Sequence, residues 1–392
     1  MRRLGLTALS LVLAALVWLP CLHLVYGRDP DASFSAERVT PRARALAARH
    51  LALWSDPDAR AREVARMRAT NAEWDFMGRT FLVLALANMA AHDPPGSPER
   101  ARALAAIDAI VEETLRLEEE RGHQHFLMPY GRYGGWKADG RSVFVDGEVA
   151  LMLGARRLVE ERADWRPLLA ERAERIVRAL EGGPVLSGES YPDECWTFCN
   201  AAALAALRVH DALDRTDHGD LARRWLETAR ARLVEPTTGL LVSRYAWDGR
   251  VMEGPEGSSI WMVAHCLALV DEPFARDQYE RARRELAIPA LGFGLAREWP
   301  RSLPGHADVD SGPIVPGLEA SAGSSGLAFL GASTFGDRAW LRGLQASLDL
   351  AGFPVEDGEG LRYAASNQVG DAVLLYAMVQ GPLWAKVREA LR

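Results

Sequence analysis

Two kinds of helical segment alternate along the chain. One kind has apolar residues on nearly every side, many of them alanine or glycine. The other kind, exemplified by residues 97–120 and 218–236, repeats apolar residues at i, i+3, i+4 and i+7 and carries charges on the opposite face. The first pattern predicts helices packed on all sides, and the second predicts helices with one face in water.

Segments of the first kind recur six times, and each opens with a polar turn that carries an acid or a glycine. Six pairs of a buried and an amphipathic helix predict an all-α fold, the (α/α)6 toroid of six helical hairpins, with the buried helices inside the ring. The inner helices are predicted to begin near Trp74, Gly147, Glu194, Ser258, Glu319 and Val369. Because they run in the same direction, their N-termini should meet at one rim.

The remaining segments complete this plan. Residues 36–70 are expected to supply the first outer helices, and the C-terminal segment from Gly381 the last. Strand signals are sparse, but residues 239–254 predict one small hairpin around the Asp248-Gly249 turn.

An apolar run of 23 residues, Leu4 to Tyr26, follows Arg2 and Arg3 at the N-terminus. As a helix it would be about 34 Å long, which is enough to cross a bilayer. No small-x-small cleavage site follows it, so it predicts an uncleaved membrane anchor with the body outside the cytoplasm. A cleaved signal and a secreted body is the alternative. The predicted division is residues 1–27 for the anchor or signal and 28–392 for the barrel.

Composition and cysteine content argue against nucleic-acid binding, a disulfide scaffold and a zinc site. The net charge of −7 argues against nucleic acid as a partner, since phosphate backbones require a basic face. The body holds only Cys195, Cys199 and Cys266, too few for a disulfide scaffold. The spacing of Cys195 and Cys199 does not match a zinc site, so no metal is predicted. The oligomeric state is left open.

The turns before the inner helices collect acids and aromatic side chains, which is typical of a pocket for a small-molecule substrate. The helix dipoles at that rim also favour negative charge. Acids such as Asp75, Glu148, Asp193 and Asp371 fit a helix-capping role equally well. The candidate substrate-binding residues are Trp74, Asp75, Tyr130, Tyr133, Trp136, Tyr191, Trp196, Asp310 and Tyr363.

The stretch from Ser190 to Asn200, SYPDECWTFCN, combines two thiols with acids where a loop becomes an Ala-rich helix. We expect Asp193 to cap this helix and Cys195 and Cys199 to share one face at i, i+4, with Cys199 toward the cavity. Asn200 should point toward the neighbouring helix. The thiols could donate protons, or they could simply fill space in a crowded helix.

This stretch resembles a segment of the linalool dehydratase-isomerase family. Pro192, Asp193, Cys199 and Asn200 match its segment with the second catalytic cysteine, and residues 232–245 and 361–363 fall in register with other family blocks. The resemblance implies an exported (α/α)6 enzyme that removes or shifts the hydroxyl of a tertiary allylic alcohol without a cofactor. The sequence departs from the family at Ser190, which aligns with the other catalytic cysteine, and at Glu148, which aligns with the catalytic histidine. The family's Asp and Tyr pair has no match upstream of residue 73.

Three functions follow from these patterns. The first is a lyase or isomerase that uses Cys199, Cys195, Glu148 and Asp193 as proton donors and acceptors. The second is a carbohydrate-active enzyme, either a glycoside hydrolase or a polysaccharide lyase, because paired acids with Trp and Tyr also suit sugars. The third is a non-catalytic envelope protein. A closed apolar cavity with Cys199 at its floor would favour the first, and two acids across an open cleft the second.

Overall fold

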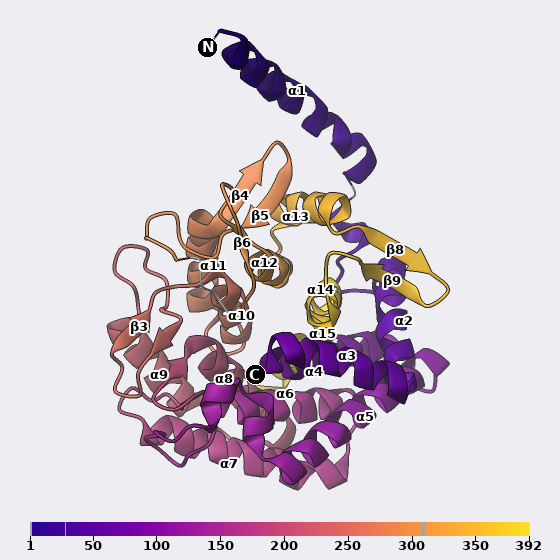
Figure 1. Ribbon diagram of the computed structural model, residues 1–392. Coiled ribbons are helices and arrows are strands. Elements are labelled where there is room, and N and C mark those ends of the chain that lie inside the picture. The colour runs from indigo at the N-terminus through magenta and orange to yellow at the C-terminus, as the bar shows by residue number, and fades with distance from the viewer. Residues whose placement is uncertain (1, 28, 307–310) are drawn as a thin grey trace.

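Six inner helices form a closed ring. The computed structural model describes residues 2–27, 29–306 and 311–392. Each inner helix packs against the next, and the last packs against the first, as Figure 1 shows. This confirms the predicted all-α (α/α)6 toroid. The inner helices are α4 (Ala72–His92), α6 (Val143–Val159), α8 (Thr197–Asp214), α10 (Gly257–Leu267), α12 (Ala322–Phe335) and α14 (Gln368–Val379).

Amphipathic helices surround this ring, each with one buried stripe. They alternate with the inner helices along the chain, and α3 (Pro57–Thr70) and four short 3-10 turns fill the connections. Side-chain caps fix several starts, as where Ser97 accepts a hydrogen bond from the backbone N–H of Arg100. The outer helices are α2 (Pro41–Ser55), α5 (Pro98–Arg121), α7 (Arg166–Gly182), α9 (Gly219–Arg232), α11 (Glu272–Leu286) and α13 (Arg338–Ala351).

The inner helices run in the same direction, because early residues of one lie against early residues of the next. Gly147 of α6 faces Ala203 of α8, and Gly257 of α10 faces Ser324 of α12. The N-termini therefore meet at one rim, as predicted. All six helices begin within four residues of the predicted positions.

Short β-strands occur in the loops between the helices. A three-stranded sheet joins β1 (Cys195–Trp196), β2 (Arg244–Tyr245) and β3 (Val251–Glu253), and its β2–β3 pair confirms the hairpin around Asp248-Gly249. The sequence did not predict the three further hairpins, whose strands have at most four residues each. These are β4 (Ala287–Ala290) with β5 (Phe293–Ala296), β6 (Ile314–Val315) with β7 (Ala320–Ser321), and β8 (Pro354–Asp357) with β9 (Gly360–Tyr363).

The C-terminal helix α15 (Pro382–Ala390) corrects the prediction that it completes the outer ring. It crosses the C-terminal ends of α4, α6 and α8, while α2 packs beside α14. The side-chain amide of Asn88 on α4 accepts a hydrogen bond from the backbone N–H of Leu383 at 3.1 Å, and Trp384 stacks on His265 with ring centroids 5.0 Å apart. These contacts satisfy polar groups at the helix ends, so α15 closes the base of the ring.

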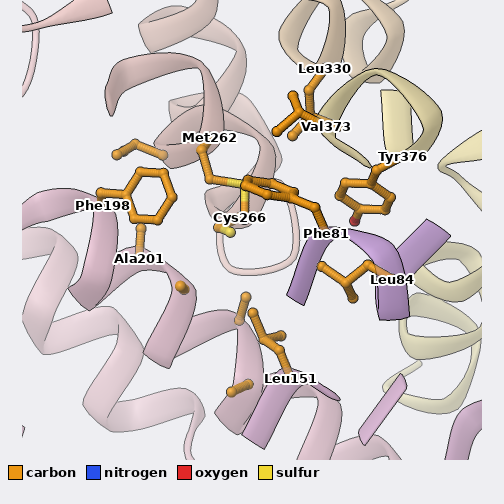
Figure 2. Packing of buried hydrophobic residues seen from close by; sticks show 14 of the residues in the cluster. Phe81, Leu84, Leu151, Phe198, Ala201, Met262, Cys266, Leu330, Val373 and Tyr376 are labelled. Carbon is orange, nitrogen blue, oxygen red and sulfur yellow. The ribbon is translucent and has the colours of Figure 1, made fainter. Parts of the chain in front are cut away.

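Apolar side chains fill the middle of the ring. Figure 2 shows Phe81 of α4, Phe198 of α8 and Met262 of α10 pointing toward one another, with Tyr376 of α14 beside them. All four are buried. The interior beneath the rim is therefore an apolar, closely packed environment.

Helix α1 (Arg2–Tyr26) stands apart from the ring, with its apolar side chains largely exposed (Figure 1). Within the residues described, it is the one helix long and apolar enough to cross a membrane. A signal sequence would pass the same test, so the division at residue 27 stays a prediction.

The contact between α6 and α8 should tolerate no added volume. A Cβ at Gly154 would lie 2.4 Å from Cγ1 of Val209. Overpacking of this kind costs about 1–3 kcal/mol, more than the ~1 kcal/mol that alanine contributes to helix propensity. Gly154→Ala should therefore lower the thermal midpoint measured by circular dichroism.

A double-mutant cycle isolates this contact. Val209→Ala should destabilise the parent but lose most of that effect when Gly154→Ala is present. A Gly154→Ala variant that melts higher than the parent would contradict the close-packing argument.

Candidate active site

Cys199 lies in the first turn of α8, at the rim end of the ring. Its side chain is buried and its thiol is hydrogen-bonded to the side chain of Ser190. Burial raises the pKa of this thiol well above its usual value, and the nearby charges of Glu73 and Glu148 raise it further. The thiol is therefore protonated at neutral pH and can act as a proton donor.

Glu148 projects from α6 and is near enough for its charge to act on this thiol. It is 1% exposed, and the hydroxyl of Thr80 on α4 donates a hydrogen bond to its Oε2 at 2.6 Å. No salt bridge reaches it within the part of the chain that the structure describes. Burial therefore raises the pKa of Glu148 to about 8, with a further contribution from the charge of Glu73. At pH 7 this carboxyl is neutral and holds a proton that it can give away.

Glu73, in the first turn of α4, is the acceptor of the site. The hydroxyl of Tyr191 donates a hydrogen bond to its Oε1, while that hydroxyl accepts one from the backbone N–H of Met128 at 2.9 Å. Tyr130 stacks on Tyr191 with ring centroids 4.4 Å apart. The backbone donor orients the tyrosine hydroxyl so that its proton points at the Glu73 carboxyl.

Sequence reasoning selected the neighbours of Glu73 and missed Glu73 itself. A helical signal was available, because Glu73 and Thr80 are seven residues apart and share the face of α4 that meets Tyr191 and Glu148. Asp75 and Arg79 form the i, i+4 ion pair on another face, with a distance of 2.8 Å. The i, i+4 spacing of Asp75 and Arg79 indicates a structural ion pair, so Asp75 was a weaker candidate for substrate binding than Glu73.

The loop before α8 is fixed by buried hydrogen bonds that hold Ser190 in place. The amide of Asn200 accepts from the backbone N–H of Gly188 at 2.8 Å and donates to its carbonyl at 3.1 Å. Ser142 donates to the carbonyl of Ser190 at 2.7 Å. Asn200 thus binds its own loop, which corrects the expectation that it serves the neighbouring helix.

Two details of the SYPDECWTFCN stretch also differ from the sequence prediction. Cys195 lies in strand β1, paired with Tyr245, so it does not share a helical face with Cys199. Asp193 does not cap α8, whose N-cap is Trp196. The backbone of Asp193 has φ = 58°, and its carboxyl accepts from the backbone N–H of Trp247 at 3.3 Å. Edge pairing with β2 delays the helix to Thr197, which moves both residues away from the expected positions.

Cys195 and Asp193 remain close to the site without contacting it in the expected way. Cys195 is fully buried, its Sγ lies 4.0 Å from the carbonyl oxygen of Ser187, and burial raises its pKa. The carboxyl of Asp193 is 41% exposed and lies 3.8 Å from Nζ of Lys137. Their predicted proton transfers stay predictions.

The predicted substrate-binding residues divide by place. Tyr191 and Tyr130 belong to the cluster around Glu73. Trp196 lies beside Arg244, whose guanidinium is 5.6 Å from the ring centroid and 3.0 Å from Glu253. Trp74 is half-buried in the first turn of α4.

The other candidates lie further from Cys199. Tyr363 accepts a hydrogen bond from Nε of Arg42 at 3.1 Å, on the α2 side of the ring. Trp136 meets His123 edge to face, and Tyr133 is 68% exposed. Asp310 lies outside the described residues.

The acids at the opposite side of the rim are engaged in holding backbone. Glu298 accepts a hydrogen bond from the backbone N–H of Ser258 at 3.1 Å, at the start of α10. Asp371 lies near the start of α14, where burial raises its pKa to about 6. No cluster of three or more His, Cys, Asp or Glu side chains able to hold a metal occurs among residues 2–27, 29–306 and 311–392.

The raised pKa of Glu148 predicts a pH-dependent stability. The folded state holds this proton up to about pH 8, whereas the unfolded chain releases it near 4.5, so the contribution of Glu148 to the free energy of unfolding falls as pH rises between these values. Between about pH 6.5 and 8 the loss should be about 1–2 kcal/mol. The contribution of Asp371 ends near pH 6, below this window.

Thermal unfolding at a series of pH values tests this assignment. Glu148→Gln keeps the shape of the neutral acid and cannot ionise, so the melting temperature of the parent should fall relative to that of the variant as pH rises across this window. Parallel curves for the two proteins would mean that Glu148 is ionised at neutral pH.

Comparisons with known proteins agree with this architecture. A family model described as linalool dehydratase/isomerase matches residues 170–369, just over half of the chain, and no curated protein matches. The unsaturated glucuronyl hydrolase of Bacillus sp. GL1 is 13% identical, with 86% of this chain and 94% of that one covered at a TM-score of 0.53, which shows the fold alone. A GH76 alpha-mannanase of Bacteroides thetaiotaomicron is 13% identical over 80% of this chain and 87% of its own, at a TM-score of 0.46. The matched residues include Ser190 and Cys199, and the chain belongs to the linalool dehydratase/isomerase family.

Proposed function

We propose that this protein is a cofactor-independent lyase or isomerase that removes water from a small, largely apolar alcohol and can return it at another carbon. The observation that carries the proposal is the buried carboxyl of Glu148, held by Thr80 within electrostatic range of the Cys199 thiol. The same carboxyl is within electrostatic range of Glu73, which binds Tyr191. Proton donors and an acceptor thus meet at one end of an apolar ring, as acid/base catalysis requires.

Dehydration needs one proton delivered and one removed. Glu148 gives its proton to the hydroxyl of the alcohol, the C–O bond breaks, and water leaves. Glu73 takes a proton from the adjacent carbon, and the electron pair of that C–H bond forms the alkene. A proton passed from Glu73 back to Glu148 resets the site.

Isomerisation uses the same groups in a different order. For an allylic alcohol, loss of water leaves positive charge shared between two carbons, and the charges of Glu73 and of ionised Glu148 stabilise it. Water added to the other carbon gives the isomer and returns a proton to the site. The thiol of Cys199 can donate a hydrogen bond to the departing or returning oxygen from its fixed place beside Ser190.

The buried side chains favour this chemistry over cleavage of sugars. Phe81, Phe198 and Met262 offer hydrocarbon surface, whereas a sugar needs hydrogen-bonding partners for its hydroxyls. The likeness to glycosidases concerns the fold, which hosts different chemistries. A carbohydrate-active or non-catalytic role has less support.

We further propose that α1 is retained as a membrane anchor, with the barrel outside the cytoplasm. Arg2 and Arg3 precede the apolar run, which favours a cytoplasmic N-terminus. Nε2 of His23, near the end of α1, donates a hydrogen bond at 2.7 Å to the carbonyl oxygen of Leu291 on the body. As a carbonyl oxygen only accepts, Nε2 of His23 carries the proton. This contact gives the end of α1 a defined place against the body.

The catalytic proposal predicts strong losses in three variants. Glu148→Gln should lower turnover of linalool at least about 100-fold, because it removes the acid without changing shape. Cys199→Ser and Cys199→Ala should also remove most turnover while the fold is kept. Gas chromatography with mass spectrometry, run in D₂O, measures alkene and isomer formation together with deuterium incorporation.

Asp220→Asn on α9 is the control, because this exposed acid pairs with Arg223 and Arg224 and belongs to none of the candidate sites. It should keep activity within about threefold of the parent. Full activity in both Glu148→Gln and Cys199→Ala, with any active alcohol, would refute the proposed proton transfers.

The anchor is tested separately on membranes of the expressing cell. Carbonate washing should leave the full-length protein in the pellet, and protease added to the outer side should digest the body. A shortened mature chain in the soluble fraction would show that Leu4 to Tyr26 is a cleaved signal.

A further inference from the structure

Large apolar side chains are exposed at one edge of the barrel. Outside α1, seven such residues are exposed in the described chain, and four of them lie on hairpin β4–β5, the β6–β7 turn and the junction between α13 and β8. We call these four the apolar edge: Leu291, Val315, Leu318 and Phe353. Their exposed fractions are 39%, 46%, 55% and 63% in that order.

Backbone strain singles out two of these residues. Leu291 and Gly292 form the two-residue loop of hairpin β4–β5, with φ of 52° and 85°. Such loops strongly prefer Asn, Asp or Gly at the first position, because other residues are strained at positive φ. Phe353 has φ = 50° as well. Leu291 and Phe353 thus have strained backbones and exposed apolar side chains. An Asn or Asp at either position would lower the free energy of the folded state through both the backbone and the solvation of the side chain.

Helix α1 leaves the body at this edge. His23 contacts the carbonyl oxygen of Leu291, and its ring lies 4.2 Å from that of Phe293, measured between centroids. The same helix packs against α13, which leads to Phe353. Figure 1 shows hairpin β4–β5 and α13 on the side of the toroid that faces α1.

The edge continues to the rim of the ring. Arg297, which follows β5, forms an ion pair with Glu319 and a backbone bridge with Ala320. These contacts hold the β6–β7 turn, and with it Leu318, beside β5. Strand β7 runs directly into α12, whose N-terminus is part of the rim.

We propose that the apolar edge lies in the interfacial layer of the bilayer that α1 crosses, so that the barrel rests on the lipid rather than hanging from a tether. The inference depends on the proposed anchoring by α1. Lipid is the partner because the edge is continuous with an apolar helix of membrane-spanning length. Contact with lipid removes the exposed side chains from water. It also brings the rim at α12 close to the membrane, so an apolar alcohol dissolved in lipid can reach the ring without crossing open water.

Lipid quenching in the full-length chain tests this contact. Cys21→Ser removes the exposed native thiol, and the other three cysteines are buried. An environment-sensitive NBD label at Leu318→Cys or Phe353→Cys, in phosphatidylcholine nanodiscs, should emit at shorter wavelength than the same label at a solvent-exposed control site. Nitroxide-bearing lipids should quench it at least threefold more than labels at two control sites. The controls are Met252→Cys, an apolar residue on β3, and Arg178→Cys on α7.

A second pair of variants separates lipid contact from folding. Leu291→Asn and Phe353→Asn place a residue suited to positive φ at each strained position, so thermal stability should stay equal or rise. Quenching of the label at position 318 should nevertheless fall at least twofold in the double variant.

A label at Leu13→Cys, within α1, distinguishes the possible failures. Quenching at position 13 without quenching at 318 would overturn the apolar-edge proposal and leave the anchor intact. Absence of quenching at both positions would overturn the anchor, and the apolar-edge proposal with it.

Discussion

The close packing of α6 against α8 is the constraint on which the rest of the site depends. Gly147 lies against Ala203 and Gly154 against Val209, so the two backbones approach closely near both ends of the contact. Glu148 follows the first of these contacts by one residue, and Cys199 lies one helical turn before Ala203, so this approach brings the two side chains near enough to interact electrostatically. A larger residue at either glycine would separate the helices and, with them, the carboxyl from the thiol.

Two acids on one helix show how environment decides their chemistry. Asp146 faces outward, where Arg141 and Arg172 pair with it at 2.7 and 2.6 Å. Glu148, two residues later, faces the ring and finds a hydroxyl instead of a cation. The first acid is therefore an ion that ties α6 to its neighbours, and the second keeps its proton at neutral pH. The two acids are about 200° apart around the helix, so one forms ion pairs with neighbouring arginines and the other keeps its proton.

The sequence was sufficient for the ring but not for the details of its rim. Whether a helix is apolar on all sides or on one face depends only on how it is buried. The sequence pattern therefore predicted the start of each inner helix to within four residues. Cys195 and Asp193 could not be placed, because a two-residue strand pairing with β2 moved the start of α8, and such pairing depends on a partner about fifty residues away. Asn200 was assigned to the wrong partner for the same reason, since the loop that it binds is folded back by tertiary contacts. Glu73 was within reach, because its spacing from Thr80 is a local property of one helix.

Helix α15 covers the end of the ring opposite the rim, where it packs on α4, α6 and α8. Leu383 and Trp384 hydrogen-bond to Asn88 and His265 on α4 and α10, so in the proposed reaction the substrate enters and the product leaves at the rim. Under the proposed reaction, substrate, hydrocarbon product and released water would all pass the same rim. If the proposed hydration is reversible, its net direction depends on how fast the alkene leaves. An alkene that stays near the rim can be hydrated again to the alcohol, whereas one that diffuses away cannot.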